Sequence, residues 1–313
     1  MNSLRRRLIL KDRHVELPRL MPATELMVAP LPERQPLLDP ILASNSLALL
    51  YGERGLGKTF VALGIAWAVA SGASFLGWTA SRPHRVLYID GEMAAVDIRE
   101  RLRLLGSAPP TLDFLIADLS SQSLPDLGYY EGQGRLQQAW GNPELVVLDN
   151  LSSLAGFKSG DPDCWSELQR FLMMQRRRGR AVLVVHHANK QGKQRGTNRR
   201  EDVLDLVMGL KRPTDWQASD GTRFEIHFDK ARGLQGEAIE PIEAHLQTDH
   251  HDVARWSWRP VRDSAFARLV ALMQEGLNAR QAGRELGLST GTTYRLRNKA
   301  RGLGLIKTRR DDT

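Results

Sequence analysis

The sequence predicts an α/β fold, with a parallel sheet flanked by helices, followed by a small all-α domain. From Ser46 onward, short apolar segments alternate with helical segments, a pattern typical of chains that build a parallel sheet. The segments Leu145–Asp149 and Ala181–His186 are apolar at most positions, which indicates strands covered on both faces. After about Arg262 the strand pattern stops, and three helical segments follow.

The composition is that of a globular chain with a sizeable core. The chain has 313 residues, 42% of them hydrophobic, so one large domain and a smaller one fit its length. No apolar run approaches the roughly 20 residues that cross a bilayer. Lys11 and Asp12 interrupt the apolar residues near the N-terminus, which argues against a secretory signal. The single cysteine, Cys164, excludes an internal disulfide framework, and we expect a cytoplasmic protein.

The charge balance favours a polyanionic partner. The formal net charge is +8 and the isoelectric point is near 9.9. The positive side chains concentrate in Lys190–Arg200 and in Arg295–Arg310. Clusters of this kind favour nucleic acid as the partner, although a generally basic surface would give the same totals.

The chain divides into three parts by composition. Residues 1–44 are polar and rich in proline, with one short helix expected at Ala23–Met27. They form either a disordered leader or an arm that docks on a neighbouring subunit, and we favour the arm. Residues 45–260 carry the alternation of strands and helices, and residues 261–313 form the small helical domain. Its predicted helices are Ser264–Glu275, Ala279–Leu286 and Thr290–Ala300.

The elements of the α/β domain follow in order. Leu47–Tyr51 is a short apolar segment that predicts a buried strand. The helix predicted at Thr59–Ser71 has so little charge that it must lie between other layers. Further strands are predicted at Arg85–Asp90, Phe114–Ala117, Leu145–Asp149, Ala181–His186, Asp205–Leu210 and Arg223–Asp229. Further helices are predicted at Val96–Leu104 and Trp165–Arg178.

A phosphate-binding loop follows the first strand of this domain. The pattern G-x-x-x-x-G-K-[ST] is matched by Gly52, Glu53, Arg54, Gly55, Leu56, Gly57, Lys58 and Thr59. The glycines let backbone N–H groups point at phosphate oxygens, and the next helix presents its positive N-terminus to the same anion. Lys58 is expected to reach the β- and γ-phosphates of ATP, and Thr59 to offer its hydroxyl to Mg²⁺.

Acidic residues complete the predicted site. Asp149 ends an apolar strand, where it is expected to hold Mg²⁺ directly or through water, with helix capping as the alternative. In many ATPases the catalytic glutamate directly follows this aspartate. Here the next residue is Asn150, so the catalytic carboxylate must come from elsewhere. We assign that role to Glu92, just beyond the second strand, where it can orient and deprotonate the attacking water. Asp90 is the rival for this role.

Two histidines end the strand that begins at Ala181. His186 and His187 are candidates to sense the γ-phosphate and to pass its state to the next loop. The alternative is a polar residue that simply ends the strand. A metal-binding pair is disfavoured, because adjacent residues of a strand point to opposite faces.

In this order, the segments resemble the RecA-like ATPase core, and more narrowly the hexameric replicative helicases, including the RepA-type helicases of plasmids. The similar stretches are Leu47–Thr59, Tyr88–Met93, Leu145–Asp149, His186–Lys190, Asp205–Pro213 and Lys230–Gly233. The phosphate loop is shared by very many families, whereas the displaced glutamate and the His-His-x-x-Lys segment are more specific. The resemblance implies a RecA-like sheet, ATP hydrolysis with Mg²⁺, and a homo-oligomeric ring, most simply a hexamer.

The resemblance also implies roles for basic residues. In such rings a neighbouring subunit inserts a basic finger into the ATP site, where it stabilises transition-state charge. Lys230 and Arg232 match the family's Lys-x-Arg hairpin, so Arg232 is the first candidate for the finger. Arg212 is the second candidate, and a plain surface charge is the alternative for each.

A basic loop follows the two histidines, at the place where that family lines its central channel with DNA contacts. Its expected contacts with single-stranded DNA are Lys190, Lys193, Arg195, Arg199 and Arg200. The loop contains no aromatic residue, so base stacking is not expected from it. A solvated loop without a partner is the alternative.

The C-terminal segment Leu277–Arg297 resembles a helix-turn-helix. Ala282 is small where two helices would cross, Gly287 permits the turn, and Ser289 can cap the second helix. The residues of this second helix that are expected to face duplex DNA are Thr290, Thr292, Thr293, Arg295 and Arg297. A protein-binding module of the same shape is the alternative.

A wing and a function complete the expectations. The residues Leu303–Lys307 look like the start of a short wing strand. The whole chain is expected to be an ATP-driven, DNA-associated motor, a RepA- or DnaB-like helicase in plasmid, phage or mobile-element replication. Two alternatives stay open: an ATP-switched DNA-binding regulator, and a recombination or repair ATPase without unwinding activity.

Overall fold

The computed structural model describes residues 20–156, 162–188, 202–213, 215–248 and 254–306. The chain divides into two compact units, Met1–Arg34 and Gln35–Thr313. In the first unit the helix α2 (Ala23–Val28) forms where the sequence predicts a helix, and none of its residues is buried. Among the helices of the described ranges, none is long and apolar enough to cross a membrane.

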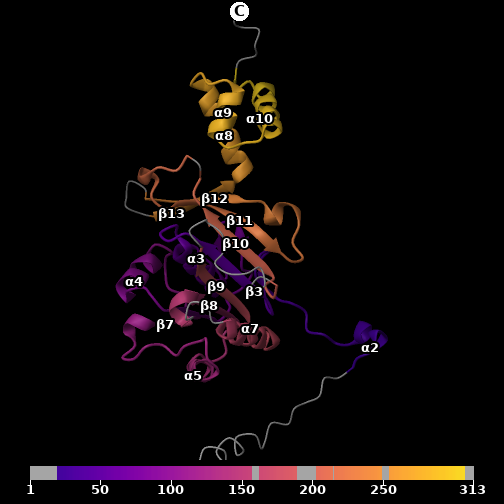
Figure 1. Ribbon diagram of the computed structural model, residues 1–313, viewed down its shortest axis with the longest axis vertical. Coiled ribbons are helices and arrows are strands. Elements are labelled where there is room, and N and C mark those ends of the chain that lie inside the picture. The colour runs from indigo at the N-terminus through magenta and orange to yellow at the C-terminus, as the bar shows by residue number, and fades with distance from the viewer. Residues whose placement is uncertain (1–19, 157–161, 189–201, 214, 249–253, 307–313) are drawn as a thin grey trace, which may run out of the picture. The chain divides into compact units, whose positions relative to one another are not determined.

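A nine-stranded sheet forms the centre of the second unit, in the order β13-β12-β11-β10-β3-β9-β8-β6-β7 (Figure 1). The strands from β10 to β7 in that order run parallel to one another. They are β10 (Leu206–Lys211), β3 (Leu47–Gly52), β9 (Ala181–His187), β8 (Leu145–Asp149), β6 (Val86–Asp90) and β7 (Leu112–Ile116). Each lies close to its predicted bounds, and this mixed α/β architecture fits a RecA-like fold.

Both faces of the parallel strands are buried, as their apolar sequences predict. Alternate residues enter two apolar clusters, with Leu50 on the face that carries the helix α3 (Lys58–Ser71) and Leu49 on the opposite face. The helix α7 (Pro162–Arg177) packs on that opposite face, where its Phe171 is buried. Burial on both sides explains why these strands lack the polar alternation of a half-exposed sheet.

The helix α3 is buried on nearly all sides. It packs between the sheet and two short antiparallel pairs of strands. These pairs are β1 (Pro36–Leu38) with β2 (Leu42–Ala43), and β4 (Ser74–Phe75) with β5 (Trp78–Thr79). The low charge of this helix therefore predicted its place between layers correctly.

An antiparallel extension continues the sheet beyond β10. It consists of β11 (Arg223–Ala231), β12 (Ile242–Thr248) and β13 (Ala254–Pro260). The sequence predicted β11 but not β12 or β13, although Ile242, Ala244 and Leu246 alternate with polar residues as in a strand with one buried face. The register of these strands sets Glu243 opposite Glu225 and Arg259.

The remaining helices of the α/β part are short. The helix α4 (Ala95–Arg103) was predicted, whereas α5 (Tyr130–Ala139) and α6 (Leu151–Leu154) were not. Gly132 and Gly134 lower the helix propensity of α5, which explains why its sequence gave little signal.

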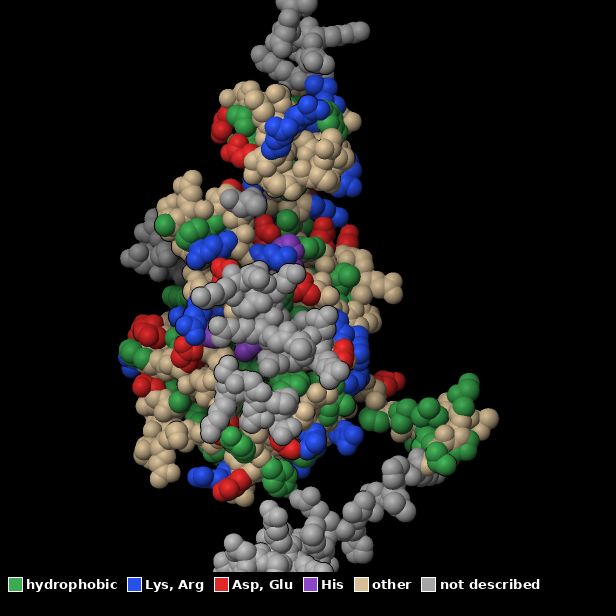
Figure 2. Space-filling model, viewed as in Figure 1, with side chains coloured by type: hydrophobic (Ala, Val, Ile, Leu, Met, Phe, Trp, Pro, Cys, Tyr) green, Lys and Arg blue, Asp and Glu red, His purple; other side chains and the backbone are tan. Residues whose placement is uncertain are grey.

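Three helices form the C-terminal end of the described chain: α8 (Val261–Gln274), α9 (Ala279–Glu285) and α10 (Thr290–Gly302). They enclose a small apolar cluster in which Ala282 is fully buried. Gly287 adopts a positive φ of 62° between α9 and α10, and Ser289 caps α10 by accepting a hydrogen bond from Thr292 N at 3.2 Å. These local predictions are confirmed, and on the face seen in Figure 2, Lys and Arg side chains gather over these helices.

The predicted wing strand is wrong for the residues that the structure describes. Leu303–Ile306 form turns rather than a strand, because Leu305 N donates to Ala300 O at 2.9 Å and holds this segment against the end of α10. Lys307 lies outside the described residues.

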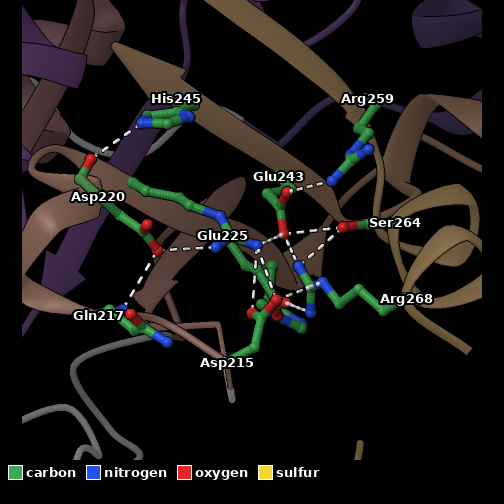
Figure 3. Close-up of polar contacts among 11 residues, drawn as sticks. Asp215, Gln217, Asp220, Glu225, Glu243, His245, Arg259, Ser264 and Arg268 are labelled. Carbon is green, nitrogen blue, oxygen red and sulfur yellow. Dashed lines mark hydrogen bonds and ion pairs between the residues drawn. The ribbon is translucent and has the colours of Figure 1, made fainter. Parts of the chain in front are cut away.

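A buried carboxylate joins α8 to the sheet extension (Figure 3). Glu243 is only 4% exposed, and it accepts hydrogen bonds from Ser264 Oγ at 2.8 Å and Arg259 Nη2 at 3.0 Å. Arg223 Nη2 lies 3.3 Å from its Oε2, and Arg268 of α8 also pairs with it. Asp215 binds both Arg223 and Arg268, so acids and guanidinium groups alternate across the cluster.

We expect Glu243→Ala to lower the free energy of unfolding by about 3–5 kcal/mol, because removing one partner of buried ion pairs leaves the others uncompensated. Urea unfolding measures this loss. The control is Glu167→Ala, whose partner Arg170 is largely exposed, so that a loss below about 1 kcal/mol is expected. Equal losses in the two variants would contradict a structural role for the cluster.

Candidate active site

The carboxyl ends of β3, β6, β8 and β9 meet at one edge of the sheet, where a cavity of about 410 Å³ opens. Its lining brings together residues that are far apart in the sequence: Gly57, Lys58, Thr59, Glu92, Asp149 and His187. The edge is the one at which open parallel sheets build their sites. The phosphate loop, the strand-ending acid and the displaced glutamate are therefore neighbours in space.

The phosphate loop has the backbone that its glycines require. Gly57 adopts a φ of 102°, and a Cβ atom there would come within 3.0 Å of the Phe224 ring, so only glycine fits. Gly57 is also the N-cap of α3, which directs the helix N-terminus at the cavity. Lys58 Nζ is held across the loop by Gly52 O at 3.0 Å and Glu53 O at 2.7 Å.

The side chains of the loop divide into those that line the cavity and those that do not. Lys58 and Thr59 line it, and burial lowers the pKa of Lys58 while the nearby Asp149 carboxylate opposes that shift. Leu56 is buried in the apolar core, whereas Glu53 and Arg54 are exposed to solvent. These three residues contribute their backbone to the loop, not a side chain to the cavity lining.

Oxygen ligands for a divalent cation lie beside the loop. Asp149 is 4% exposed and hydrogen-bonded to the Thr59 side chain, so a carboxylate and a hydroxyl meet at one point of the cavity. Hard oxygen donors of this kind suit Mg²⁺. Burial raises the pKa of Asp149, and the hydrogen bonds from Tyr88 and Thr59 oppose that rise. The donor set therefore fits the metal that the sequence predicts.

Glu92 and Asp90 occupy different environments. The Glu92 side chain is 56% exposed at the cavity, where Asn150 Nδ2 donates to its carboxylate and His187 Nε2 lies 3.6 Å away. Asp90 is 1% exposed, and its Oδ1 accepts from the backbone N–H groups of Glu92 at 2.9 Å and Met93 at 2.7 Å. Asp90 thus fixes the turn that presents Glu92, which favours Glu92 over its rival.

The two histidines face different surroundings. His187 lines the cavity, and burial together with the Lys58 charge lowers the pKa of His187, so that its ring is neutral at pH 7. His186 is 5% exposed and packs among Leu49, Trp165 and other residues on the α7 side of the sheet. The structure does not bring His186 to the phosphate loop, because adjacent residues of a strand point to opposite faces.

The three candidate fingers lie at two edges of the sheet. Lys230 near the end of β11 and Arg232 just beyond it lie at the amino edge of the parallel strands, where Arg232 Nη2 donates to Asp202 O at 2.8 Å. Arg212 follows β10 at the carboxyl edge, with its guanidinium 3.7 Å from the centre of the Trp216 ring. None of the three is among the described residues that line the cavity of this chain.

Of the expected DNA contacts, the structure describes those in α10 but not those in the basic loop. Lys190, Lys193, Arg195, Arg199 and Arg200 all lie outside the described residues. In α10, Arg295 is exposed, and Arg297 lies over the Tyr294 ring at 4.5 Å and bonds to Asn298. Arg295 and Arg297 therefore lie on either side of the buried Leu296, with Arg295 exposed and Arg297 half-buried. Thr293 is 2% exposed and packs inside the helices, so the expectation that it faces DNA is wrong.

Sequence reasoning missed several residues around the cavity. Asn150 bonds to the carboxylate of Glu92 and Tyr88 to that of Asp149, and Arg101 and Thr222 contribute to the lining. Asn150 could have been found from its position directly after Asp149, at the functional edge of the sheet. Thr222 could not, because it reaches the cavity from a segment more than 160 positions beyond the phosphate loop.

Comparisons with known proteins give one family and distant relatives. The model of an AAA domain family, AAA_25, matches residues 12–193. The DNA repair protein RadA of Brucella abortus (strain 2308) is 25% identical over 169 residues, which are 52% of this chain and 33% of RadA, so this chain spans about a third of that relative's length.

Two solved structures are similar at low identity. The KaiC-like protein PH0186 of Pyrococcus horikoshii OT3 has a TM-score of 0.46 and 15% identity, covering 70% of this chain and 93% of its own. The flagellar accessory protein FlaH of Methanocaldococcus jannaschii has a TM-score of 0.47 and 10% identity, covering 68% and 90% respectively.

We expect the buried Asp90 to make stability depend on pH. Burial raises the pKa of Asp90 from 3.8 to about 6, so the native state binds more protons than the unfolded state between these values. The contribution of Asp90 to the free energy of unfolding is most favourable below pH 3.8, where the carboxyl is protonated in both states, and it is lost as the pH rises through about 6. In Asp90→Asn the neutral amide keeps the acceptor and avoids this loss.

Urea unfolding of metal-free, nucleotide-free protein measures the effect. Relative to wild type, Asp90→Asn should gain up to about 3 kcal/mol between pH 4 and pH 7, since one pKa unit corresponds to about 1.4 kcal/mol. A constant difference between the two proteins across this range would contradict the raised pKa.

Proposed function

Because this chain belongs to the AAA_25 family of AAA domains, which implies nucleotide binding and ATP hydrolysis, we propose that Gly52–Thr59 and the acids beside it form its ATPase site. The observation that carries this proposal is the meeting of Lys58, Asp149 and Glu92 around one cavity. Each comes from a different segment, and together they supply a phosphate cradle, a metal ligand and a base.

The phosphate loop binds the triphosphate. Backbone N–H groups of the loop and the N-terminus of α3 present positive potential to the phosphates. Lys58 exchanges its bonds to the Gly52 and Glu53 carbonyls for phosphate oxygens, and the low exposure of this residue strengthens the attraction between its ammonium group and the phosphate. Thr59 and Asp149 would hold Mg²⁺, which would neutralise part of the charge on the phosphates.

Glu92 acts as the general base. Its carboxylate is at the cavity, while Asn150 and His187 restrain it from two sides. A carboxylate held in this way orients a water molecule and accepts its proton as the water oxygen attacks the γ-phosphorus. The bond from that phosphorus to the bridging oxygen breaks, and ADP leaves. His187 is neutral and close to both Lys58 and Glu92, so it is suited to respond to the charge of the terminal phosphate.

A neighbouring subunit completes the site. The sequence resemblance supports a role for Arg232, Lys230 and Arg212 in the site of another copy. Within the part of the chain that the structure describes, none of the three lines the cavity. Arg232 remains the first candidate and Arg212 the second. An assembly of this kind is a ring or filament, and a hexamer is the form that the sequence resemblance favours.

DNA is the proposed partner of the assembly. Support comes from the net charge of +8, from the exposed Arg295 on α10, and from the relative that is named a DNA repair protein. We propose a DNA-associated motor with residues 45–260 as the ATPase and residues 261–313 as a helix-turn-helix, most simply a helicase. An ATP-switched regulator or a repair ATPase without unwinding is the second candidate, which the similarity to RadA favours.

We expect Lys58→Ala to abolish nucleotide binding, and Glu92→Gln to bind ATP while hydrolysing it about 10²–10⁴-fold more slowly, because only the proton acceptor is lost. Fluorescent-nucleotide titration and phosphate release measure the two steps. Full hydrolysis by Lys58→Ala would contradict the proposed ATPase site.

Strand displacement on a forked duplex separates the motor from the second candidate, since only the motor unwinds with ATP.

We expect the double variant Arg295→Ala and Arg297→Ala to weaken duplex binding and to reduce its salt dependence, because each phosphate contact adds about one to the slope. Fluorescence anisotropy at several salt concentrations measures both quantities. The control is the double variant Arg99→Ala and Arg103→Ala on α4, which removes the same amount of charge. Both of these arginine side chains are exposed and paired with Glu100. Equal losses in both double variants would contradict a specific DNA role for α10.

A further inference from the structure

Tyr88 places a phenol hydroxyl next to the metal-binding acid. It lies in β6, beside β8, and its side chain is fully buried. Its hydroxyl donates a hydrogen bond to Asp149 Oδ2 at 2.6 Å.

The surroundings of the Tyr88 ring are otherwise apolar. The ring packs against Phe114 with centroids 5.4 Å apart and belongs to the apolar cluster beneath α3. A phenylalanine would fill this space equally well, and a hydroxyl is costly to bury unless it is hydrogen-bonded. Packing therefore does not explain the hydroxyl, whereas the bond to Asp149 does.

We propose that Tyr88 is a positioning residue for Asp149, which fixes the carboxylate in the orientation that holds Mg²⁺ with the nucleotide. This inference rests on the proposed ATPase site. The Tyr88 hydroxyl donates to Oδ2 of Asp149 from the buried side of the carboxylate, and the Thr59 side chain also bonds to this carboxylate. These two hydrogen bonds restrict rotation of the carboxylate about its Cβ–Cγ bond. Partners of this type change metal affinity by about 10–100-fold when they are removed.

The test is Tyr88→Phe, which removes one oxygen atom and keeps the ring. We expect the Mg²⁺ concentration for half-maximal ATPase activity to rise about 10-fold or more, with kcat at saturating Mg²⁺ within about threefold of wild type. A second readout is independent of turnover. Electron paramagnetic resonance should show Mn²⁺ bound about 10-fold more weakly in the presence of a non-hydrolysable ATP analogue.

The chain offers a matched control in Tyr51→Phe. Tyr51 is also a buried strand tyrosine, and it donates to the carboxylate of Asp229, outside the cavity lining. This variant loses an equivalent hydrogen bond, so it should lose stability on thermal unfolding but keep wild-type Mn²⁺ affinity. Wild-type Mn²⁺ affinity in Tyr88→Phe, or the same loss in Tyr51→Phe, would overturn the proposal.

Lys58→Ala separates this proposal from the one on which it rests. If Lys58→Ala loses nucleotide binding while Tyr88→Phe keeps wild-type Mn²⁺ affinity, the ATPase site is supported and only the role of Tyr88 is contradicted. Wild-type nucleotide binding and hydrolysis in Lys58→Ala removes the ATPase site, and with it the role of Tyr88.

Discussion

The direction of the parallel strands is the constraint on which the site depends. Because β3, β9, β8 and β6 run the same way, their carboxyl ends meet at one edge, and each strand delivers a polar residue or loop there. The phosphate loop follows β3, His187 ends β9, Asp149 ends β8, and Glu92 follows β6. Reversing any one strand would move its functional residue to the opposite edge of the sheet.

Concentrating charge at this edge has an energetic cost that the surrounding groups offset. Asp149 and Asp90 are nearly inaccessible to solvent and stand opposite each other in neighbouring strands. Asp149 is compensated by Tyr88, Thr59 and Lys58, and Asp90 accepts hydrogen bonds from two backbone N–H groups, yet burial raises the pKa of both carboxyl groups. The site is therefore a place where stability is given up for pre-arranged electrostatics, as is common at functional sites.

The antiparallel extension connects this edge with the C-terminal helices. Thr222 lines the cavity, and Phe224 packs where a side chain at Gly57 would lie. Between them, Arg223 binds Glu243, which in turn binds Ser264 and Arg268 of α8 (Figure 3). One short segment thus forms part of the cavity wall and part of the polar cluster that holds α8. The α/β part and the C-terminal helices of this unit are therefore joined by side-chain contacts of the Thr222–Phe224 segment as well as by the chain itself.

By itself, the sequence determined most of the local elements of the parallel part and the types of residue that line the candidate site. The bounds of the parallel strands, the loop at Gly52–Thr59 and the cap at Ser289 follow from periodicity and from short-range bonds, which a single chain segment carries. Only the tertiary structure decided that Asp90 supports Glu92, that His187 and not His186 faces the cavity, and that Tyr88 holds Asp149. These facts depend on which face a strand residue presents and on which strands are neighbours, and both are set by packing between distant segments.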